Sequence, residues 1–521
     1  MKKLSFLFVL AVCACVLHGK NPKYVFLFIG DGMATPQRMV ADEFSRKMGR
    51  GQLALNTLPC HATTRTNSTD SLVTDSAAAA TAIACGEKTR SGRIGMDSEG
   101  KRKLESVAYV AKRNGKKVGI VTSVTINHAT PAGFYAHRPL RSQYYAIGLD
   151  LIGSGFDYFG GGGVQKNDDK TAPEYKGDIY KLAAEAGYKV VRDKTGLLAL
   201  RPGEGKVLAV GAKGKLPYSI DARGDVATLA EYTAKGIELL DNPKGFFMMV
   251  EGGAIDWCGH ANEAAGNLHE VLALDEAVRV ALAFAQKHPG ETLIIVTGDH
   301  ETGGMTMGFA GTGYAIYMER LINQKCSHDA FAAKIDEAKK DDSAFSFEKA
   351  KKFLAADFGF RFPDPRKEPR VCSEEEAKLL QSAFKKNKLP ETVRTLLDKK
   401  SKGSWTDREA ALLARKIADG RKADARFSFG DAKKILTGDF QFVFDPMVVG
   451  EKEMKTLQDG FKKNKLANAA RIVMAGKAGI GWTSGSHTAL PVLTTSKGAG
   501  AELFSGFIDN TDIAKKLKTL L

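Results

Sequence analysis

The run Tyr24-Val25-Phe26-Leu27-Phe28-Ile29, followed by Gly30-Asp31-Gly32, has the pattern of a β-strand that is buried on both faces. Its residues are apolar without alternation, which is typical of central strands in a parallel sheet. Three further runs share this pattern and end at polar residues or glycine: residues 118–122, 246–250 and 292–297. Helical patterns occupy the intervening chain: residues 104–114, 226–240 and 267–287.

This alternation of strands and helices predicts an α/β fold. We expect a doubly wound, mostly parallel central sheet with helices on both faces. In such folds, ligands bind at the carboxyl ends of the strands. Polar residues that directly follow the apolar runs are therefore candidates for a functional site.

The composition of the 521-residue chain is that of a globular protein, with 43% hydrophobic and 26% charged residues. It excludes a disordered chain, a coiled coil and a polytopic membrane protein. The net charge of +16 would suit an anionic partner. However, the lysines are scattered and no RNA- or DNA-binding motif is present, so no nucleic-acid partner is expected. The cysteines after residue 19 form no CxxC pair, which disfavours a thiolate metal site.

The first residues have the pattern of a secretory signal peptide. Lys2 and Lys3 precede an apolar run over residues 4–17, which is short for a membrane span. We predict that residues 1–19 are removed and that the protein is exported to the periplasm or the cell exterior. Acylation at Cys13 or Cys15 is an alternative that the preceding residues fit poorly. No later run is long and apolar enough for a membrane span in the mature chain.

Residues 312–470 differ from the rest of the chain and predict a mostly helical insert. They are rich in Lys, Ala, Glu and Phe and contain two recurring sequences. Phe-Ser-Phe-Glu-Lys-Ala-Lys-Lys at 345–352 returns as Phe-Ser-Phe-Gly-Asp-Ala-Lys-Lys at 427–434, and Phe-Lys-Lys-Asn-Lys at 384–388 returns at 461–465. Two copies of a unit of about 80 residues are too few for a solenoid. The insert is either a surface cap or a crown that forms a dimer or gates the substrate.

The flanking segments, residues 20–311 and 471–521, would form the α/β core around this insert. The return to the core is expected near Gly479, and the chain is expected to end in a helix over residues 512–521.

Several candidate site residues follow predicted strands or begin predicted helices. Asp31 follows the first strand, and Asp75-Ser76 precede an alanine run that indicates a helix. Ser76 is either a helix-capping serine or a nucleophile whose alkoxide is favoured by the helix dipole and a bound cation. His128 and Thr130 lie in a turn fixed by a proline.

Arginine, carboxylate and imidazole groups complete the candidate site. Arg141 is either a solvated side chain or a fork that binds two phosphate oxygens. Asp256 and His260 are four residues apart, so a helix would place them on one face, and this combination of ligands suits zinc. The remaining candidates also have side chains that can bind a metal. Three of them lie at or after the end of a predicted strand, Glu251, Asp299 and His300, and the fourth is His487.

Together these motifs resemble those of the alkaline phosphatase family. They occur in the family's order and cover about 24–310 and 470–510: Asp31-Gly32, Asp75-Ser76 with the following Ala run to Thr81, His128-Ala129-Thr130-Pro131, Glu251…Asp256…His260, Asp299-His300 and His487-Thr488. The resemblance implies a secreted enzyme that hydrolyses small phosphate monoesters to an alcohol and phosphate through a phosphoserine. It also implies a homodimer. The insert has no counterpart in the minimal family member.

The resemblance also implies a role for each site residue. Ser76 would be the nucleophile, and Arg141 would bind the phosphate with help from Asp75. The site would contain two Zn²⁺ ions and one Mg²⁺ ion. The expected ligands are Asp256, His260 and His487 for one zinc; Asp31, Asp299, His300 and Ser76 for the other; and Asp31, Thr130 and Glu251 for magnesium.

Two positions match a variant of the family. His128 stands where enteric bacterial members have Asp, and Trp257 stands where they have Lys. The resemblance then predicts a more alkaline optimum and weaker magnesium retention. Trp257 would either stack on the organic part of the substrate or form a wall of the site. Thr130 and Glu251 disfavour a phosphodiesterase or sulfatase-like relative, and the complete ligand set disfavours a non-enzymatic phosphate-binding protein.

Overall fold

The computed structural model describes residues 21–521, and within them the core is a ten-stranded sheet of order β16-β2-β15-β8-β1-β7-β3-β4-β6-β5. Strand β15 runs antiparallel to β2 and β8, whereas the other neighbouring strands of this sheet are parallel. The strands are β1 (Tyr24–Gly30), β2 (Cys60–Arg65), β3 (Lys117–Thr125), β4 (Tyr158–Gly162), β5 (Tyr188–Val191), β6 (Lys206–Val210), β7 (Phe246–Gly252), β8 (Thr292–Gly298), β15 (Val492–Gly498) and β16 (Gly506–Asp509).

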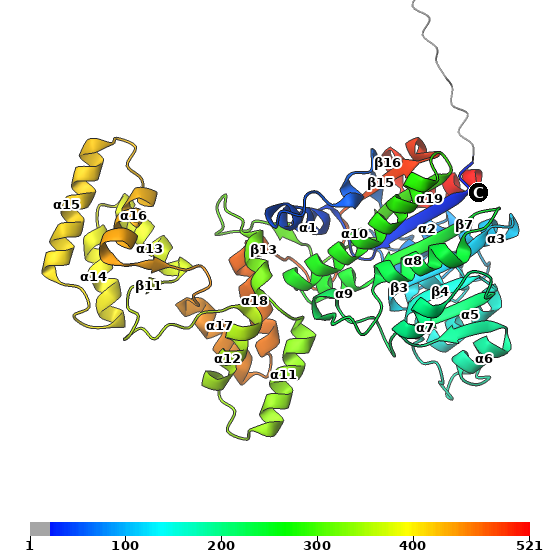
Figure 1. The fold of residues 1–521 in the computed structure, drawn as a ribbon, viewed down its shortest axis with the longest axis horizontal. Helices are drawn as coiled ribbons and strands as arrows, with labels where there is room; N and C mark the ends of the chain where they lie inside the picture. Colours follow the sequence, from blue (N-terminus) through cyan, green and yellow to red (C-terminus); the bar gives the residue numbers. More distant parts are fainter. Residues whose placement is uncertain (1–20) are drawn as a thin grey trace, which may run out of the picture.

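Helices cover both faces of this sheet (Figure 1). Along β1, Tyr24, Phe26 and Phe28 enter one hydrophobic core, while the alternate residues enter the other. The first core contains α1 (Thr35–Lys47), α7 (Lys194–Ala199), α8 (Leu229–Leu240) and α10 (Ala264–Lys287). The second contains α2 (Ser76–Cys85), α3 (Val107–Arg113), α5 (Tyr144–Ser154), α6 (Ile179–Glu185) and α19 (Asn510–Leu520). The predicted doubly wound α/β fold is confirmed.

The four predicted apolar runs form the central strands β1, β3, β7 and β8, but some predicted helix boundaries were wrong. Helix α3 begins at Val107 rather than at residue 104, because Ser106 caps it by accepting a hydrogen bond from the Tyr109 amide. Helix α8 begins at Leu229 rather than at residue 226, because Thr228 and Glu231 form a capping box.

The predicted signal segment, residues 1–19 with Cys13 and Cys15, lies outside the described residues. Among residues 21–521, every helix is too short or too polar to cross a lipid bilayer. The cysteines of this part of the chain are free thiols: Cys60, Cys85, Cys258, Cys326 and Cys372.

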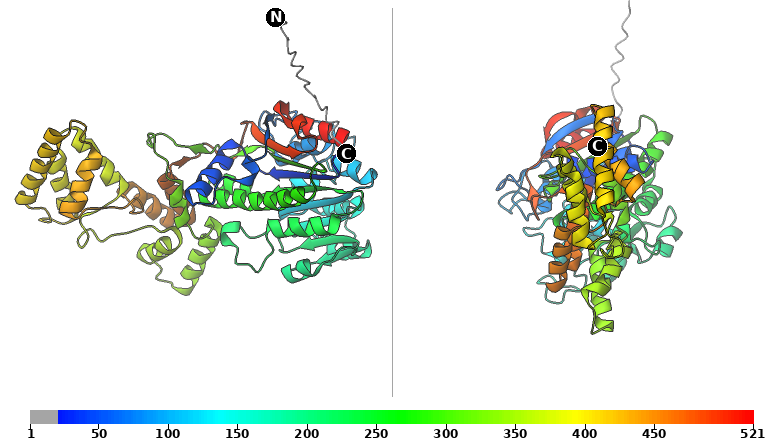
Figure 2. Two further views of the ribbon diagram at one scale, coloured as in Figure 1. Left: turned by 45° about the horizontal axis from the view of Figure 1, so that its top comes forward. Right: turned by 90° about the vertical axis from the view of Figure 1, so that its left-hand side faces the viewer.

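Residues 328–478 form eight helices in two bundles that extend the molecule along its longest axis (Figures 1 and 2). The proximal bundle, beside the α/β core, contains α11 (His328–Asp341), α12 (Phe347–Phe358), α17 (Glu451–Lys462) and α18 (Leu466–Ala478). The distal bundle contains α13 (Glu374–Lys385), α14 (Leu389–Lys400), α15 (Asp407–Ala423) and α16 (Phe429–Phe440), and it has its own hydrophobic core. The expected boundary at residue 470 falls inside α18, so we propose that the insert ends at Ala478.

Each of the two sequence repeats contributes half of its helices to the proximal bundle and half to the distal bundle. One repeat supplies α11–α14 and the other supplies α15–α18, and each bundle combines two helices from each repeat. The aromatic contacts correspond: the rings of Phe347 and Phe461 are 5.7 Å apart in the proximal bundle, and those of Phe384 and Phe429 are 5.9 Å apart in the distal bundle. The repeat seen in the sequence is therefore also a repeat in the structure.

Two linkers, residues 359–373 and 441–450, join the bundles. Strands β11 (Val371–Cys372) and β12 (Val443–Phe444) pair with one another where the linkers reach the distal bundle. Lys400 Nζ donates to the Val371 carbonyl at 2.7 Å, and the equivalent Lys477 donates to the Val448 carbonyl at 3.0 Å. Each linker is thus held by a lysine of the same repeat position.

Candidate active site

Acidic side chains meet at the carboxyl edge of the sheet. Asp31 follows β1, Glu251 is the penultimate residue of β7, and Asp299 follows β8. Because the last residues of these neighbouring parallel strands are in register, the three carboxylates lie close together. All three are fully buried.

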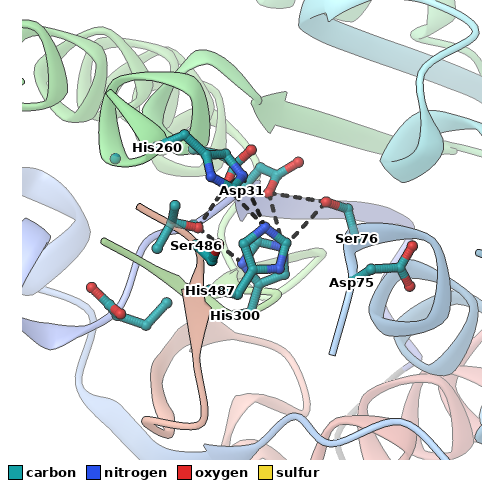
Figure 3. A network of polar contacts seen from close by, with 12 residues as sticks. Asp31, Asp75, Ser76, His260, His300, Ser486 and His487 are labelled. Atoms are coloured by element: carbon teal, nitrogen blue, oxygen red, sulfur yellow. Dashed lines mark hydrogen bonds and ion pairs between the residues drawn. The ribbon is translucent and has the colours of Figure 1, made fainter. Parts of the chain in front are cut away.

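Asp31, Asp299 and His300 form the first cluster of possible metal ligands. Figure 3 shows Asp31 and His300 side by side. His300 Nε2 lies 3.3 Å from Asp31 Oδ1 and 3.3 Å from Asp299 Oδ2. Thr302 Oγ1 donates to Asp256 Oδ1 at 2.5 Å, so it accepts the hydrogen of His300 Nδ1, 3.2 Å away. This hydrogen bond leaves the lone pair of His300 Nε2 directed at two carboxylates.

Asp256, His260 and His487 form the second cluster. Asp256 and His260 lie on the predicted common face of α9 (Ala254–His260). The Nε2 atoms of His260 and His487 are 3.1 Å apart, and each is 3.4 Å from Asp256 Oδ1. The Nδ1 atoms lie 2.8 Å from the carbonyls of Gly485 and Thr74, respectively, so they donate and leave the facing Nε2 lone pairs free.

Asp31, Glu251 and His128 form the third cluster. Thr130, from α4 (Ala129–Ala132), donates to Asp31 Oδ2 at 3.2 Å, and Thr122 donates to Glu251 Oε2. Burial raises the pKa of Glu251 to about 8. Burial and the Arg141 guanidinium lower the pKa of His128 to about 4, so its imidazole is neutral near pH 7.

The donor atoms of these clusters fit divalent cations. Asp299 Oδ2 and Glu251 Oε1 are buried and have no hydrogen-bond partner in the described chain. Facing imidazole lone pairs beside a carboxylate are repulsive unless a cation lies between them. The first two clusters suit zinc, because their carboxylates and unprotonated imidazole nitrogens face one another. In the third cluster the Thr130 hydroxyl lies beside the carboxylates of Asp31 and Glu251, and this set of oxygens suits magnesium.

Ser76 is the first residue of α2, and Asp75 is its N-cap. Asp75 Oδ1 accepts from the Ala78 amide at 3.0 Å, so the alternative that Ser76 caps the helix is wrong. The Ser76 hydroxyl instead points into the first cluster (Figure 3), with Oγ 3.1 Å from His300 Nε2 and 3.4 Å from Asp31 Oδ1. The nucleophile candidate and the possible metal ligands are thus in contact.

Arg141 contacts Asp75, the residue that precedes Ser76. Its guanidinium donates to Asp75 Oδ2 at 3.0 Å and lies 3.4 Å from His128 Nε2. Trp257 stands edge-on to the His128 ring, with centroids 6.0 Å apart. The structure therefore brings every predicted site residue to one place.

Sequence reasoning missed two residues that support this site. Thr302 links the first two clusters, and Thr122 contacts Glu251. Gly32, which belongs to the predicted Asp31-Gly32 motif, donates its amide to Asp299 Oδ1 at 3.0 Å. Thr302 follows Asp299-His300 closely, but a threonine after a strand has no spacing that distinguishes it from an ordinary turn residue.

A family model described as "Alkaline phosphatase" matches residues 22–521. The chain belongs to the alkaline phosphatase family. It is therefore a phosphatase that acts on phosphomonoesters, as the resemblance predicted.

Similar proteins span most of this alkaline phosphatase. Alkaline phosphatase 3 of Bacillus subtilis (strain 168) is 28% identical over 510 residues, which cover 95% of this chain and 88% of the relative. The alkaline phosphatase of Escherichia coli (strain K12) is 33% identical over 54% of this chain and 71% of its own. The crystal structure of a cold-active alkaline phosphatase from Shewanella sp. has a TM-score of 0.68 at 25% identity, covering 96% of this chain and 99% of that one.

Proposed function

We propose that this protein is an exported alkaline phosphatase that forms a phosphoserine on Ser76 at a site for two Zn²⁺ ions and one Mg²⁺ ion. The observation that carries the proposal is the position of Ser76 Oγ, 3.1 Å from His300 Nε2 and 3.4 Å from Asp31 Oδ1. A serine that shares its surroundings with possible metal ligands is placed for activation as a nucleophile.

Each proposed ion has a set of residues to hold it. The sets are Asp256, His260 and His487 for one zinc; Asp31, Asp299, His300 and Ser76 for the other; and Asp31, Thr130 and Glu251 for magnesium. When bound, a pair of such cations stabilises the attacking and leaving oxygens of an in-line displacement, as is general for two-metal phosphatases.

In the first step, Ser76 Oγ attacks the phosphorus of the monoester. A bond forms between Oγ and phosphorus, and the hydroxyl proton of Ser76 passes to solvent. The bond from phosphorus to the alcohol oxygen breaks, and this oxygen takes up a proton from solvent as the alcohol leaves. In the second step, water attacks the phosphoserine, the Oγ–phosphorus bond breaks, and inorganic phosphate and free Ser76 are formed. The position of Ser76 at the start of α2 directs the helix dipole toward the negative charge of both steps.

Arg141 would bind two nonbridging phosphate oxygens through its planar guanidinium. Its contact with Asp75 orients the guanidinium without saturating its donors. Recognition would therefore centre on the phosphate, which permits many organic groups. The neutral imidazole of His128 and the ring of Trp257 would border the space for these groups.

The export of this enzyme and its homodimeric state belong to the same proposal. Lys2, Lys3 and the apolar run at 4–17 support signal-directed export with removal of residues 1–19. N-terminal sequencing of the secreted protein and its mass by light scattering would test these two statements.

The proposal is tested by p-nitrophenyl phosphate hydrolysis between pH 7 and 10, with metal content determined for each protein. We expect activity that rises toward alkaline pH, two zinc ions per chain, and near-total loss in Ser76→Ala. Ser154→Ala, which removes a hydroxyl near the end of α5, is the matched control and should retain activity. Wild-type-like turnover in Ser76→Ala would refute the phosphoserine mechanism.

A further inference from the structure

The segments that lead into and out of the helical insert contact His260, the last residue of α9, and the turn that follows this helix. Helix α9 also carries Asp256. Helix α9 has only seven residues, and His260 is the most exposed of the proposed metal ligands, with 41% of its side chain accessible. Its position therefore depends on groups outside its own helix.

The entry side of the insert contacts Glu263. This carboxylate is fully buried three residues after His260. Glu263 Oε1 accepts from Gln324 Nε2 at 2.7 Å and from the His328 amide at 2.7 Å. Glu263 Oε2 accepts from His328 Nδ1 at 2.6 Å. Gln324 follows the 3-10 helix η3 (Met318–Asn323), and His328 is the first residue of α11. Glu263 therefore binds the start of the insert, together with Asp221, whose Oδ1 accepts from the Ser327 amide at 2.8 Å.

The exit side of the insert contacts the neighbouring residues of the same turn. After α18, β13 (Ile480–Gly481) pairs with β10 (Thr306–Met307) of the core. The Ser484 carbonyl then accepts from Asn262 Nδ2 at 2.7 Å, and the Gly485 carbonyl lies 2.8 Å from His260 Nδ1. The ligand His487 comes two residues later.

We propose that Glu263 is a positioning residue for the Asp256–His260–His487 zinc site, through which the insert holds His260 toward His487. The inference rests on the proposed function. A buried carboxylate with three donors fixes the turn after α9 against α11, while the exit segment fixes the His260 ring. The insert is then a structural part of the metal site and not only a surface cap.

The experiment measures zinc release from the full-length zinc-loaded enzyme into an excess of a chromogenic chelator. Glu263→Gln keeps the shape of the side chain and removes its charge, so it should release one of the two zinc ions about tenfold faster or more. Added zinc should restore kcat. Glu270→Gln is the matched control, because Glu270 is also buried but accepts from the Ser219 amide of the core. This control should lower thermal stability and keep the wild-type rate of zinc release.

A second variant and a stoichiometry measurement make the result decisive. His328→Leu removes the imidazole donor to Glu263 Oε2 and should also speed zinc release. It provides the test if Glu263→Gln does not fold. Wild-type release rates in the folded variants, or equal acceleration in Glu270→Gln, would overturn the inference. The proposed function is tested apart from it by Asp256→Asn, which should bind one zinc fewer than the wild type. If the wild type and Asp256→Asn bind equal zinc, the site assignment itself fails.

Discussion

Thr302 lies between the two proposed zinc sites and hydrogen-bonds to a ligand of each. It donates to Asp256 Oδ1 at 2.5 Å and lies 3.2 Å from His300 Nδ1. One hydroxyl thus sets the orientation of a carboxylate and the tautomer of an imidazole. Groups that orient metal ligands in this way typically contribute about 10–100-fold to metal affinity.

We therefore expect Thr302→Val to weaken zinc binding about 10-fold or more, with little change in shape. Competition with a chelator of known affinity would measure the effect. Thr519→Val, which removes an exposed hydroxyl in α19, provides the control. Equal zinc affinity in Thr302→Val and the wild type would show that His300 and Asp256 are held by other contacts.

His128 stands within the third cluster, where a neutral imidazole faces Asp31 and Glu251. An aspartate there adds a negative charge beside a proposed magnesium site, and oxygen ligands suit this ion. The His128→Asp variant should consequently reach full activity at a lower magnesium concentration than the wild type, and it should retain magnesium through gel filtration. An unchanged magnesium dependence would contradict the assignment of this cluster.

Most site residues could be predicted from sequence because their types are restrictive. An Asp-His pair after a buried run or an Asp and His four apart on a helix occurs seldom without a site. The supporting threonines could not be predicted in this way. Thr122 lies within β3 and resembles any strand threonine until the fold places Glu251 beside it.

Helix α18 and α14, its equivalent in the other repeat, differ in residue type where their surroundings differ. Ala475 and Ala478 of α18 are buried in the proximal bundle beside the core. Their equivalents 77 residues earlier are Asp398, which is exposed in α14, and Ser401, which directly follows that helix. Because the distal bundle has no α/β core against it, polar residues are tolerated on that face.

The distal bundle has a hydrophobic core of its own, whereas the proximal bundle shares one with the α/β core, so we expect the two bundles to unfold separately. Phe384 is buried in the distal core, and Phe384→Ala should lower the free energy of unfolding of that bundle by about 3 kcal/mol. Calorimetry should show one transition shifted down, with kcat/KM for p-nitrophenyl phosphate unchanged. The matched Phe461→Ala removes the equivalent ring of the proximal bundle and should shift the other transition. A single transition that moves equally in both variants would mean that the insert unfolds as one unit.

Strands were predictable from sequence where burial on both faces makes the run continuously apolar, as in β1, β7 and β8. Strands β4, Tyr158–Gly162, and β15, Val492–Gly498, were not predicted. Three glycines in β4 and a Thr-Thr-Ser sequence in β15 hide the apolar signal. Their place in the sheet comes from pairing with neighbours that the sequence does not show.

At the scale of the whole molecule, the clustered carboxylates couple metal binding to stability. Burial and the neighbouring Asp299 raise the pKa of Asp31, so ionising these groups without a cation is unfavourable. Chelation should lower the melting temperature reversibly. Each tenfold increase in free zinc above the dissociation constant should add about 1.4 kcal/mol per site to the free energy of unfolding. A melting temperature that is independent of chelator would contradict this coupling, and Asp299→Asn should respond less than the wild type.

The exchange of helices between repeats could not be predicted from sequence. The repeated segments at 345–352 and 427–434 specify the same local helices whether each repeat folds alone or with the other. The contacts of Phe384 with Phe429, and of Phe347 with Phe461, depend instead on the paths of the two linkers. Which helices of the two repeats pack together depends on the whole chain, and no short stretch of sequence indicates it.

The two linkers between the bundles have a consequence for proteolysis. A protease that cuts once within residues 359–373 produces two fragments, and each still supplies two helices to the proximal bundle: α11 and α12 from one, α17 and α18 from the other. The distal bundle stays attached through residues 441–450. We expect two bands on a denaturing gel but one unchanged species in gel filtration, and separation of the fragments under native conditions would contradict this. Only a cut in both linkers would free the distal bundle.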